Sequence, residues 1–230
     1  MSPEYVIPYV KAHKNDERDA EAIAEAASRP TMRFVPVKTQ GQSDLQSLHR
    51  ARERLVGDRT ALINHLRALM LERGTTAAKG RARLWREVRG LLAEPPVEFS
   101  RRISLLVEDL AADWARLDAR IKAFDKEIAE IARSDAAMRR LSTVPGIGPI
   151  NATALVAAIG DARAFSRGRD LSAWLGLVPR QATTGGKPRL LGISKRGNRC
   201  LRKTWSMVHG RSCHDLPRRI HISVAGFATS

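Results

Sequence analysis

The stretch Ser100–Arg133, SRRISLLVEDLAADWARLDARIKAFDKEIAEIAR, carries the clearest helical pattern of the 230-residue chain. Its apolar residues fall into two registers with alternating spacings of three and four: Ile103, Leu110, Leu117, Phe124 and Ile131 in one, and Val107, Trp114, Ile121 and Ile128 in the other. Such spacing, kept over about four heptads, is typical of a coiled-coil seam. An ordinary core helix is the alternative interpretation.

A second long helix is predicted over Ser43–Arg73, where leucines recur every seven residues at Leu48, Leu55, Leu62 and Leu69, with Leu45 and Leu66 beside them. Arg52 and Arg59 interrupt this seam, which argues against a pure coiled coil. Gly74 ends the helix, and a shorter helix, Arg81–Ala93, stops before Pro95 and Pro96. We expect residues 43–135 to form an antiparallel helical arm that packs within the chain or onto a second copy.

The charge of the chain points to a polyanionic partner. The formal net charge is +16 and the pI is near 11.0, a balance that most often indicates nucleic acid. The segment from Leu171 to Arg219 contains 11 Lys or Arg residues and only one acid, Asp215. The segment Asp16–Glu25 is acidic instead. The first region is therefore predicted to hold phosphates, and the second a cation.

The cysteines and the N-terminal sequence bear on the cellular compartment. Cys200 and Cys213 lack the spacing of a zinc site or a disulfide framework, which favours a reduced chain. The first residues, MSPEYVIPYV, are not a signal peptide, and no apolar run reaches membrane-spanning length. We expect a cytoplasmic protein without a membrane partner.

The remaining segments complete a mainly α fold class. Tyr5–Val10 is at best an edge strand because Pro8 interrupts it, Asn15–Arg29 is a helix capped by Asn15 or Asp16, and Arg33–Val37 is a second short strand. Residues 136–212 would form a compact helical C-terminal domain, and residues 213–230 an irregular tail.

The stretch Leu141–Gly160, LSTVPGIGPINATALVAAIG, matches a helix-hairpin-helix pattern. A short helix would end at Thr143, and a second helix would start near Asn151. Gly146 and Gly148 in the turn let the backbone come close to a phosphate, and the N–H groups of the following helix would point at it. The alternative is a corner that only packs.

The stretch Ala182–Pro188, ATTGGKP, is predicted to be a flexible turn that offers the hydroxyls of Thr183 and Thr184. Basic residues surround it: Arg180, Lys187, Arg189, Lys195 and Arg196. A hydroxyl there either binds phosphate or attacks it as a nucleophile, and residue chemistry alone does not separate these roles from turn stabilisation.

Asp16 and Asp19 are spaced to share one face of a helix, so both carboxylates can reach one Mg²⁺. Such pairs in phosphoryl-transfer sites hold a metal ion, which polarises the phosphate and orients the attacking group. The competing interpretation is local: Asp16 caps the helix and Asp19 faces its dipole.

Four stretches occurring together resemble the DEDD-type insertion-sequence transposases: KNDERDAEAIAEA, RFVPVKTQGQSDLQSLHRARERLV, VPGIGPINATALVAAIG and WLGLVPRQATTGGKPRLLGISKRGN. The resemblance implies DNA recombination with Mg²⁺-bound acids and a covalent phosphoserine intermediate, guided by a bridge RNA. It places Asp16 and Asp19 at the family's last two acids and Thr184 at its nucleophilic serine. The helical arm would assemble protomers, and RNA would share the basic surface.

Three departures from the family pattern shape the functional expectation. The family's first two acids would lie upstream of Asp16, a threonine replaces the serine, and the sequence after Arg211 loses the helical pattern. We therefore expect a transposase truncated at both ends and impaired in catalysis. By the same resemblance, residues 1–42 would be the remnant of the family's α/β acidic DEDD catalytic domain. The alternative is a non-enzymatic nucleic-acid-binding module that oligomerises with the full-length transposase.

Overall fold

The computed structural model describes residues 3–11, 15–32, 34, 37–77, 79–160 and 165–202. The chain divides into two compact units, Met1–Thr39 and Gln40–Ser230. Among the described helices, none combines the length and the apolar character that crossing a membrane requires.

The first unit is helical. It contains α1 (Pro3–Val6), a 3₁₀ turn (Ile7–Tyr9) and α2 (Asp16–Ala27). The predicted edge strand at Tyr5–Val10 is therefore wrong, because Pro8 lies in the first turn of the 3₁₀ segment, where its missing N–H costs nothing. The helix predicted after Asn15 is confirmed. Of the predicted strand Arg33–Val37, Phe34 and Val37 are in no strand, and the other three residues lie outside the described part.

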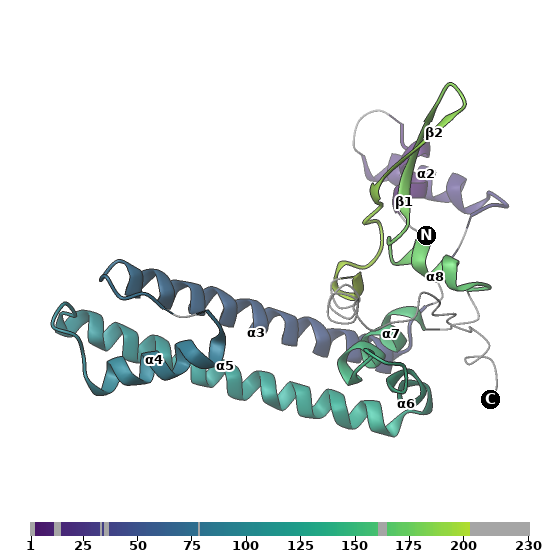
Figure 1. Cartoon of the computed structure of the whole chain (residues 1–230). Helices are drawn as coiled ribbons and strands as arrows, with labels where there is room; N and C mark the ends of the chain where they lie inside the picture. Colours follow the sequence, from purple (N-terminus) through teal and green to yellow (C-terminus); the bar gives the residue numbers. More distant parts are fainter. Residues whose placement is uncertain are drawn as a thin grey trace. The chain divides into compact units, whose positions relative to one another are not determined.

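Two long helices of the second unit form the arm. They are α3 (Gln40–Leu71) and α5 (Arg101–Ser134), joined through α4 (Arg81–Ala93) (Figure 1). Arg52 Nε lies 2.5 Å from an Asp125 carboxylate oxygen, and an Arg59 nitrogen lies 2.6 Å from Asp118. Contacts that advance along α3 while receding along α5 require antiparallel helices, so the predicted arm is confirmed and packs within the chain.

The core of the arm is richest where α4 folds back on the long helices. Its largest apolar cluster includes Ile63, Leu66, Leu69, Met70, Leu84, Val88, Phe99, Val107, Ala111 and Trp114. Trp85 of α4 meets Trp114 edge to face, with ring centroids 4.9 Å apart. On α5, the register of Val107, Trp114, Ile121 and Ile128 is buried, whereas the register that contains Leu110 and Leu117 is only partly covered.

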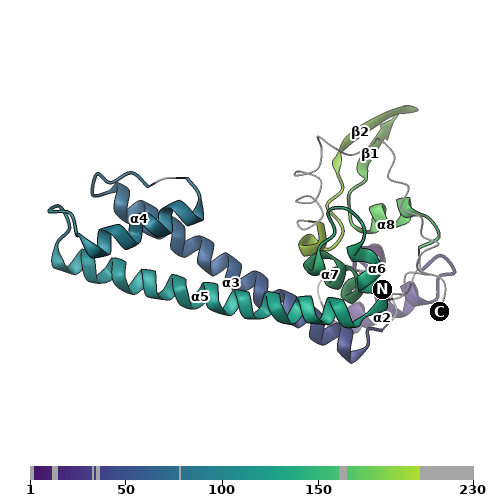
Figure 2. The same ribbon diagram turned by 60° about the horizontal axis from the view of Figure 1, so that its bottom comes forward.

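The other end of the arm carries two short helices, α6 (Ala136–Ser142) and α7 (Pro149–Ile159). Small residues of α7 are buried against the arm, and one cluster joins Leu45 of α3, Ala132 of α5 and Ile147 of the connecting turn. Figures 1 and 2 both show α6 and α7 at the end of the arm that is opposite to α4.

The C-terminal region contains α8 (Gly168–Trp174) and an antiparallel pair, β1 (Pro179–Thr184) and β2 (Lys187–Ile193). The mainly α fold class is confirmed, but the helical C-terminal domain also contains this pair of strands, and the flexible turn predicted at Ala182–Pro188 is corrected to a hairpin. Gly185 and Gly186, with φ values of 57° and 75°, form a two-residue connection of the type that suits twisted strands. The tail at 213–230 lies outside the described residues.

Candidate nucleic-acid interface

The turn Val144–Gly148, here called the glycine corner, joins α6 to α7. The Ile147 N–H donates to the Val144 carbonyl over 3.0 Å. Gly146 has a φ of +87°, which with Pro145 before it gives a type II turn. Gly148 is the N-cap of α7, and its carbonyl accepts from the N–H groups of Asn151 and Ala152 at 3.0 Å. Two short helices joined by a tight turn are therefore present as expected, while the phosphate-binding role of a helix-hairpin-helix stays a prediction.

The glycine corner is anchored on one side and open on the other. Ile147 is buried in the core, whereas Gly146 and Gly148 are exposed. A Cβ at Gly148 would meet nothing within 4 Å. A phosphate therefore has space to approach the backbone at the start of α7, where the helix dipole favours negative charge.

A buried histidine holds α7 in place. His49 Nε2 of α3 lies 3.0 Å from the Thr153 hydroxyl, and that hydroxyl donates to the Pro149 carbonyl over 2.7 Å. Because the hydroxyl proton is used, Nε2 carries the ring proton and donates it. Burial, and to a smaller extent the positive charge of Arg52, lowers the pKa of His49 from 6.5 to about 4, so the ring is neutral near pH 7.

The contact between His49 and Thr153 was not predicted, because the sequence pattern of α3 pointed only to its leucines. No sequence signal singles out His49, because five of the six residues between Leu48 and Leu55 are polar. Gln46, one turn earlier, donates from Nε2 to the Ala157 carbonyl over 2.8 Å. Together the two side chains fix α7, and with it the glycine corner, to the arm.

The strand register separates the two threonines. Thr184 pairs with Lys187 and Ala182 with Arg189, whereas Thr183 pairs with Pro188. Because side chains alternate along a strand and paired residues share a face, Thr184 lies on one side with Lys187 and Arg189. We call this side, made by Ala182, Thr184, Lys187 and Arg189, the basic hairpin face.

Thr183 belongs to the opposite side of the hairpin. Its hydroxyl accepts a 3.0 Å hydrogen bond from Gln181 Nε2, and its other neighbours on that side are Pro188 and Leu190. Both threonines are exposed, but only Thr184 stands beside cations.

The base of the hairpin is fixed by close backbone contact. A Cβ at Gly197 would lie 2.2 Å from the Trp174 carbonyl oxygen, and one at Gly176 would lie 2.7 Å from the Arg196 nitrogen. The Lys195 N–H donates to the Gly176 carbonyl over 3.0 Å. The five basic residues predicted to bind phosphate are all exposed, three of them in the strands and two directly after β2: Arg180, Lys187, Arg189, Lys195 and Arg196.

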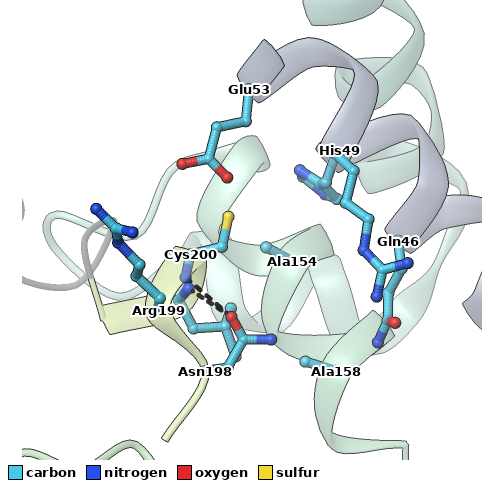
Figure 3. Close-up of a pocket in the computed structure, with 10 residues that line it drawn as sticks. Gln46, His49, Glu53, Ala154, Ala158, Asn198, Arg199 and Cys200 are labelled. Atoms are coloured by element: carbon cyan, nitrogen blue, oxygen red, sulfur yellow. Dashed lines mark hydrogen bonds between the residues drawn. The ribbon is translucent and has the colours of Figure 1, made fainter. Parts of the chain in front are cut away.

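A cavity of about 630 Å³ lies between the base of the arm and the segment that follows β2 (Figure 3). His49, Arg50 and Glu53 line it from α3, Ala154 and Ala158 from α7, and Asn198–Leu201 from the opposite side. Asn198 Oδ1 accepts from the Cys200 N–H over 2.9 Å, which turns the chain at this wall. The cavity could not be predicted from the sequence, because the α3 wall and the Asn198–Leu201 wall lie about 150 residues apart.

The acidic pair lies in the first unit, at the start of α2. Asn15 is the N-cap and its side chain accepts from the Glu17 N–H over 3.2 Å, so Asp16 is not used as the cap. Asp16 is exposed and Asp19 half-buried. Two carboxylates are enough for a Mg²⁺ site, because proteins usually supply only one or two ligands to this ion, and waters and substrate phosphates supply the others. Within the described residues no group of three or more His, Cys, Asp or Glu is arranged to hold a metal.

Known proteins similar to this chain point to one family. A family model described as "Transposase IS116/IS110/IS902 family" matches residues 138–218. A DEDD-type IS110 model described as "Transposase" matches residues 5–73. These two ranges contain the glycine corner, the hairpin and the acidic pair.

Curated relatives extend the similarity over most of the chain. A "Probable family 20 transposase" of Pseudomonas aeruginosa is 47% identical over 211 residues, covering 91% of this chain and 62% of the relative. The "Transposase for insertion sequence element IS1111A" of Coxiella burnetii is 44% identical over 210 residues, covering 91% and 57%. The chain thus spans about three-fifths of the length of these relatives, and it belongs to the IS116/IS110/IS902 family of insertion-sequence transposases.

Proposed function

We propose that the chain binds DNA through the glycine corner and the basic hairpin face, and that the Thr184 hydroxyl attacks the DNA backbone during transposition. The observation that carries this proposal is the strand register, which puts Thr184 beside Lys187 and Arg189. Thr183, whose hydroxyl is bonded to Gln181, lies on the other side.

The proposed step is a transesterification. Thr184 Oγ attacks the phosphorus, its proton passes to a base or to solvent, and the bond from phosphorus to one strand end breaks. That strand end leaves as a hydroxyl, and the other strand end stays linked to Thr184 as a phosphate diester. Attack by a second strand hydroxyl then reverses the step and transfers the DNA. Lys187 and Arg189 offset the charge on the phosphate oxygens.

A divalent metal belongs to this proposal through the family's DEDD acids, and we take it to be Mg²⁺. Asp16 and Asp19 would hold it through their carboxylates. When bound, it would supply positive charge that polarises the phosphate. Lys187 and Arg189 would orient the DNA strand at Thr184.

A covalent-adduct assay tests the function. The protein is incubated with DNA from an insertion-sequence end, Mg²⁺ and guide RNA, and protein–DNA adducts that survive denaturation are counted. Thr184→Ala should abolish the adduct, and Thr183→Ala, a change of equal size on the opposite side of the strand, should keep it. Loss of the adduct only in the Thr183 variant would overturn the assignment.

A second candidate is a nucleic-acid-binding module that assembles with other transposase chains and does not cleave. It is favoured by the partly covered register of α5 and by the exposed Leu105 and Leu106, which a second copy of the arm would bury. A guide RNA would then compete with DNA for the same basic surface. Salt-dependent binding and a concentration-dependent mass, without adduct on any substrate, would favour this candidate.

A further inference from the structure

The outward side of α4 carries three arginines at three-residue intervals. Arg83, Arg86 and Arg89 are all exposed, whereas Leu84 and Val88 on the opposite side are fully buried. Residues three apart follow one side of a helix, so the arginines form a continuous strip, here called the α4 arginine face. It runs along about 9 Å of helix, the axial rise of two to three phosphates of one DNA strand.

The charge of this strip is not used inside the fold. Some exposed basic residues of the arm have nearby acids: Arg54 pairs with Asp58, Arg116 with Asp113 and Lys126 with Glu130. Arg83, Arg86 and Arg89 form no ion pair with any residue in the described part of the chain. The exposed Arg101, Arg102, Arg120 and Lys122 of α5 share this property, but only the three arginines of α4 follow one another at three-residue intervals on one helix side. Residues 79–93 contain five Lys or Arg and one acid, Glu87.

The strip lies at a fixed distance from the glycine corner. Trp85 of α4 contacts Trp114 of α5, and Ile147 of the corner packs in one cluster with Ala132 of α5. From residue 114 to residue 132, α5 rises about 27 Å. A duplex of roughly eight base pairs spans that length.

We propose that the α4 arginine face is a second DNA contact, which holds the phosphates of a duplex whose other end lies at the glycine corner. Arginine suits this role because its charge is permanent and its planar donors match phosphate oxygens. Contact through phosphates would carry no sequence preference of its own. It would set the register of the duplex along the arm.

A second copy of the chain does not explain this strip. A two-fold contact between two α4 helices would bring arginine against arginine, which is repulsive. The choice of DNA over RNA rests on the proposed function.

The test compares two loop-capped DNA stems, one of about 6 base pairs and one of about 20, or roughly 20 and 70 Å long. Binding of each stem is measured by fluorescence anisotropy at several salt concentrations. The variant is Arg83→Gln/Arg86→Gln/Arg89→Gln. The control, Arg54→Gln/Arg116→Gln/Lys126→Gln, removes the same charge at paired positions of the arm, and circular dichroism checks the helix content of both.

The α4 variant should bind the long stem at least about tenfold more weakly, with a salt slope lower by about 2–3, and should bind the short stem as the wild type does. The control should change both affinities less than about twofold. Equal affinities of the α4 variant and the control for the long stem would overturn the second contact while leaving the proposed function intact. An RNA stem of about 20 base pairs is measured in parallel: a loss of affinity by the α4 variant for the RNA stem alone would overturn the second DNA contact in favour of an RNA site. A wild type that binds neither DNA stem would overturn both proposals.

Discussion

Thr183 and Thr184 are adjacent and chemically identical, yet the hairpin sends their side chains to opposite sides. The sequence predicted that a hydroxyl stands among cations, and family resemblance selected Thr184. Which neighbours each hydroxyl has depends on the pairing of Thr184 with Lys187. A flexible turn has no strand pairing. The prediction of a turn at Ala182–Pro188 could therefore not tell which residues lie beside each threonine.

Replacing Thr184 by serine should raise the rate of adduct formation. The threonine methyl restricts rotation about χ1 and crowds the approach of the oxygen to phosphorus, and serine keeps the hydroxyl without the methyl. The measurement is the initial rate of adduct formation for Thr184→Ser, with Thr183→Ser as the control. A slower Thr184→Ser variant with unchanged DNA affinity would contradict the argument that the threonine methyl hinders the attack.

His49 should make the protein less stable as the pH falls from 6.5 to 4. Its pKa is near 4 in the folded state against 6.5 when unfolded, so the unfolded chain binds more protons in that window. The neutral ring contributes roughly 2–3 kcal/mol to the free energy of unfolding. This contribution is fully present above pH 6.5 and is lost as the pH falls toward 4.

The check for His49 is the free energy of unfolding across this pH range, for the wild type and for His49→Gln. The difference between the two proteins should shrink as the pH falls. A difference that stays constant from pH 6.5 to 4 would show that the buried ring does not titrate as the geometry requires.

Among the elements, the arm was the most predictable part, because the periodic apolar residues of α5 are a local property of the sequence. Arg52 and Arg59 looked like breaks in the seam of α3. In the fold they are ion-paired across the arm with Asp125 and Asp118. Such pairing depends on how the two helices are aligned, which neither helix specifies by itself.

Asp118→Asn should lower the free energy of unfolding by about 1–3 kcal/mol, because the Arg59 side chain, only 14% exposed, would keep its charge without its partner. The control is Asp58→Asn, which breaks an exposed pair with Arg54 and should cost under about 1 kcal/mol. Both are measured by denaturant unfolding. Equal losses would mean that the Arg59–Asp118 pair does not join the helices.

At the scale of the whole molecule, composition predicted the polyanionic partner and the four motifs predicted the family, and the family is confirmed. The two strands were missed because a short Thr- and Gly-rich stretch has no helical or strand period strong enough to stand out. The cavity and the His49 contact were missed because each joins segments far apart in the sequence. The residue types of the site could be predicted from the sequence. Which of them share a face of the hairpin, and how far apart they lie, follows only from the fold.

The most direct test of the central claim is the salt dependence of DNA binding by Lys187→Gln/Arg189→Gln, compared with Arg54→Gln/Arg116→Gln, which removes the same charge from the arm. If the basic hairpin face holds the DNA backbone, the first variant should bind a 20-base-pair duplex more weakly, with a salt slope lower by about 2. The arm variant should keep the wild-type slope. Equal slopes for the wild type and Lys187→Gln/Arg189→Gln would contradict the account.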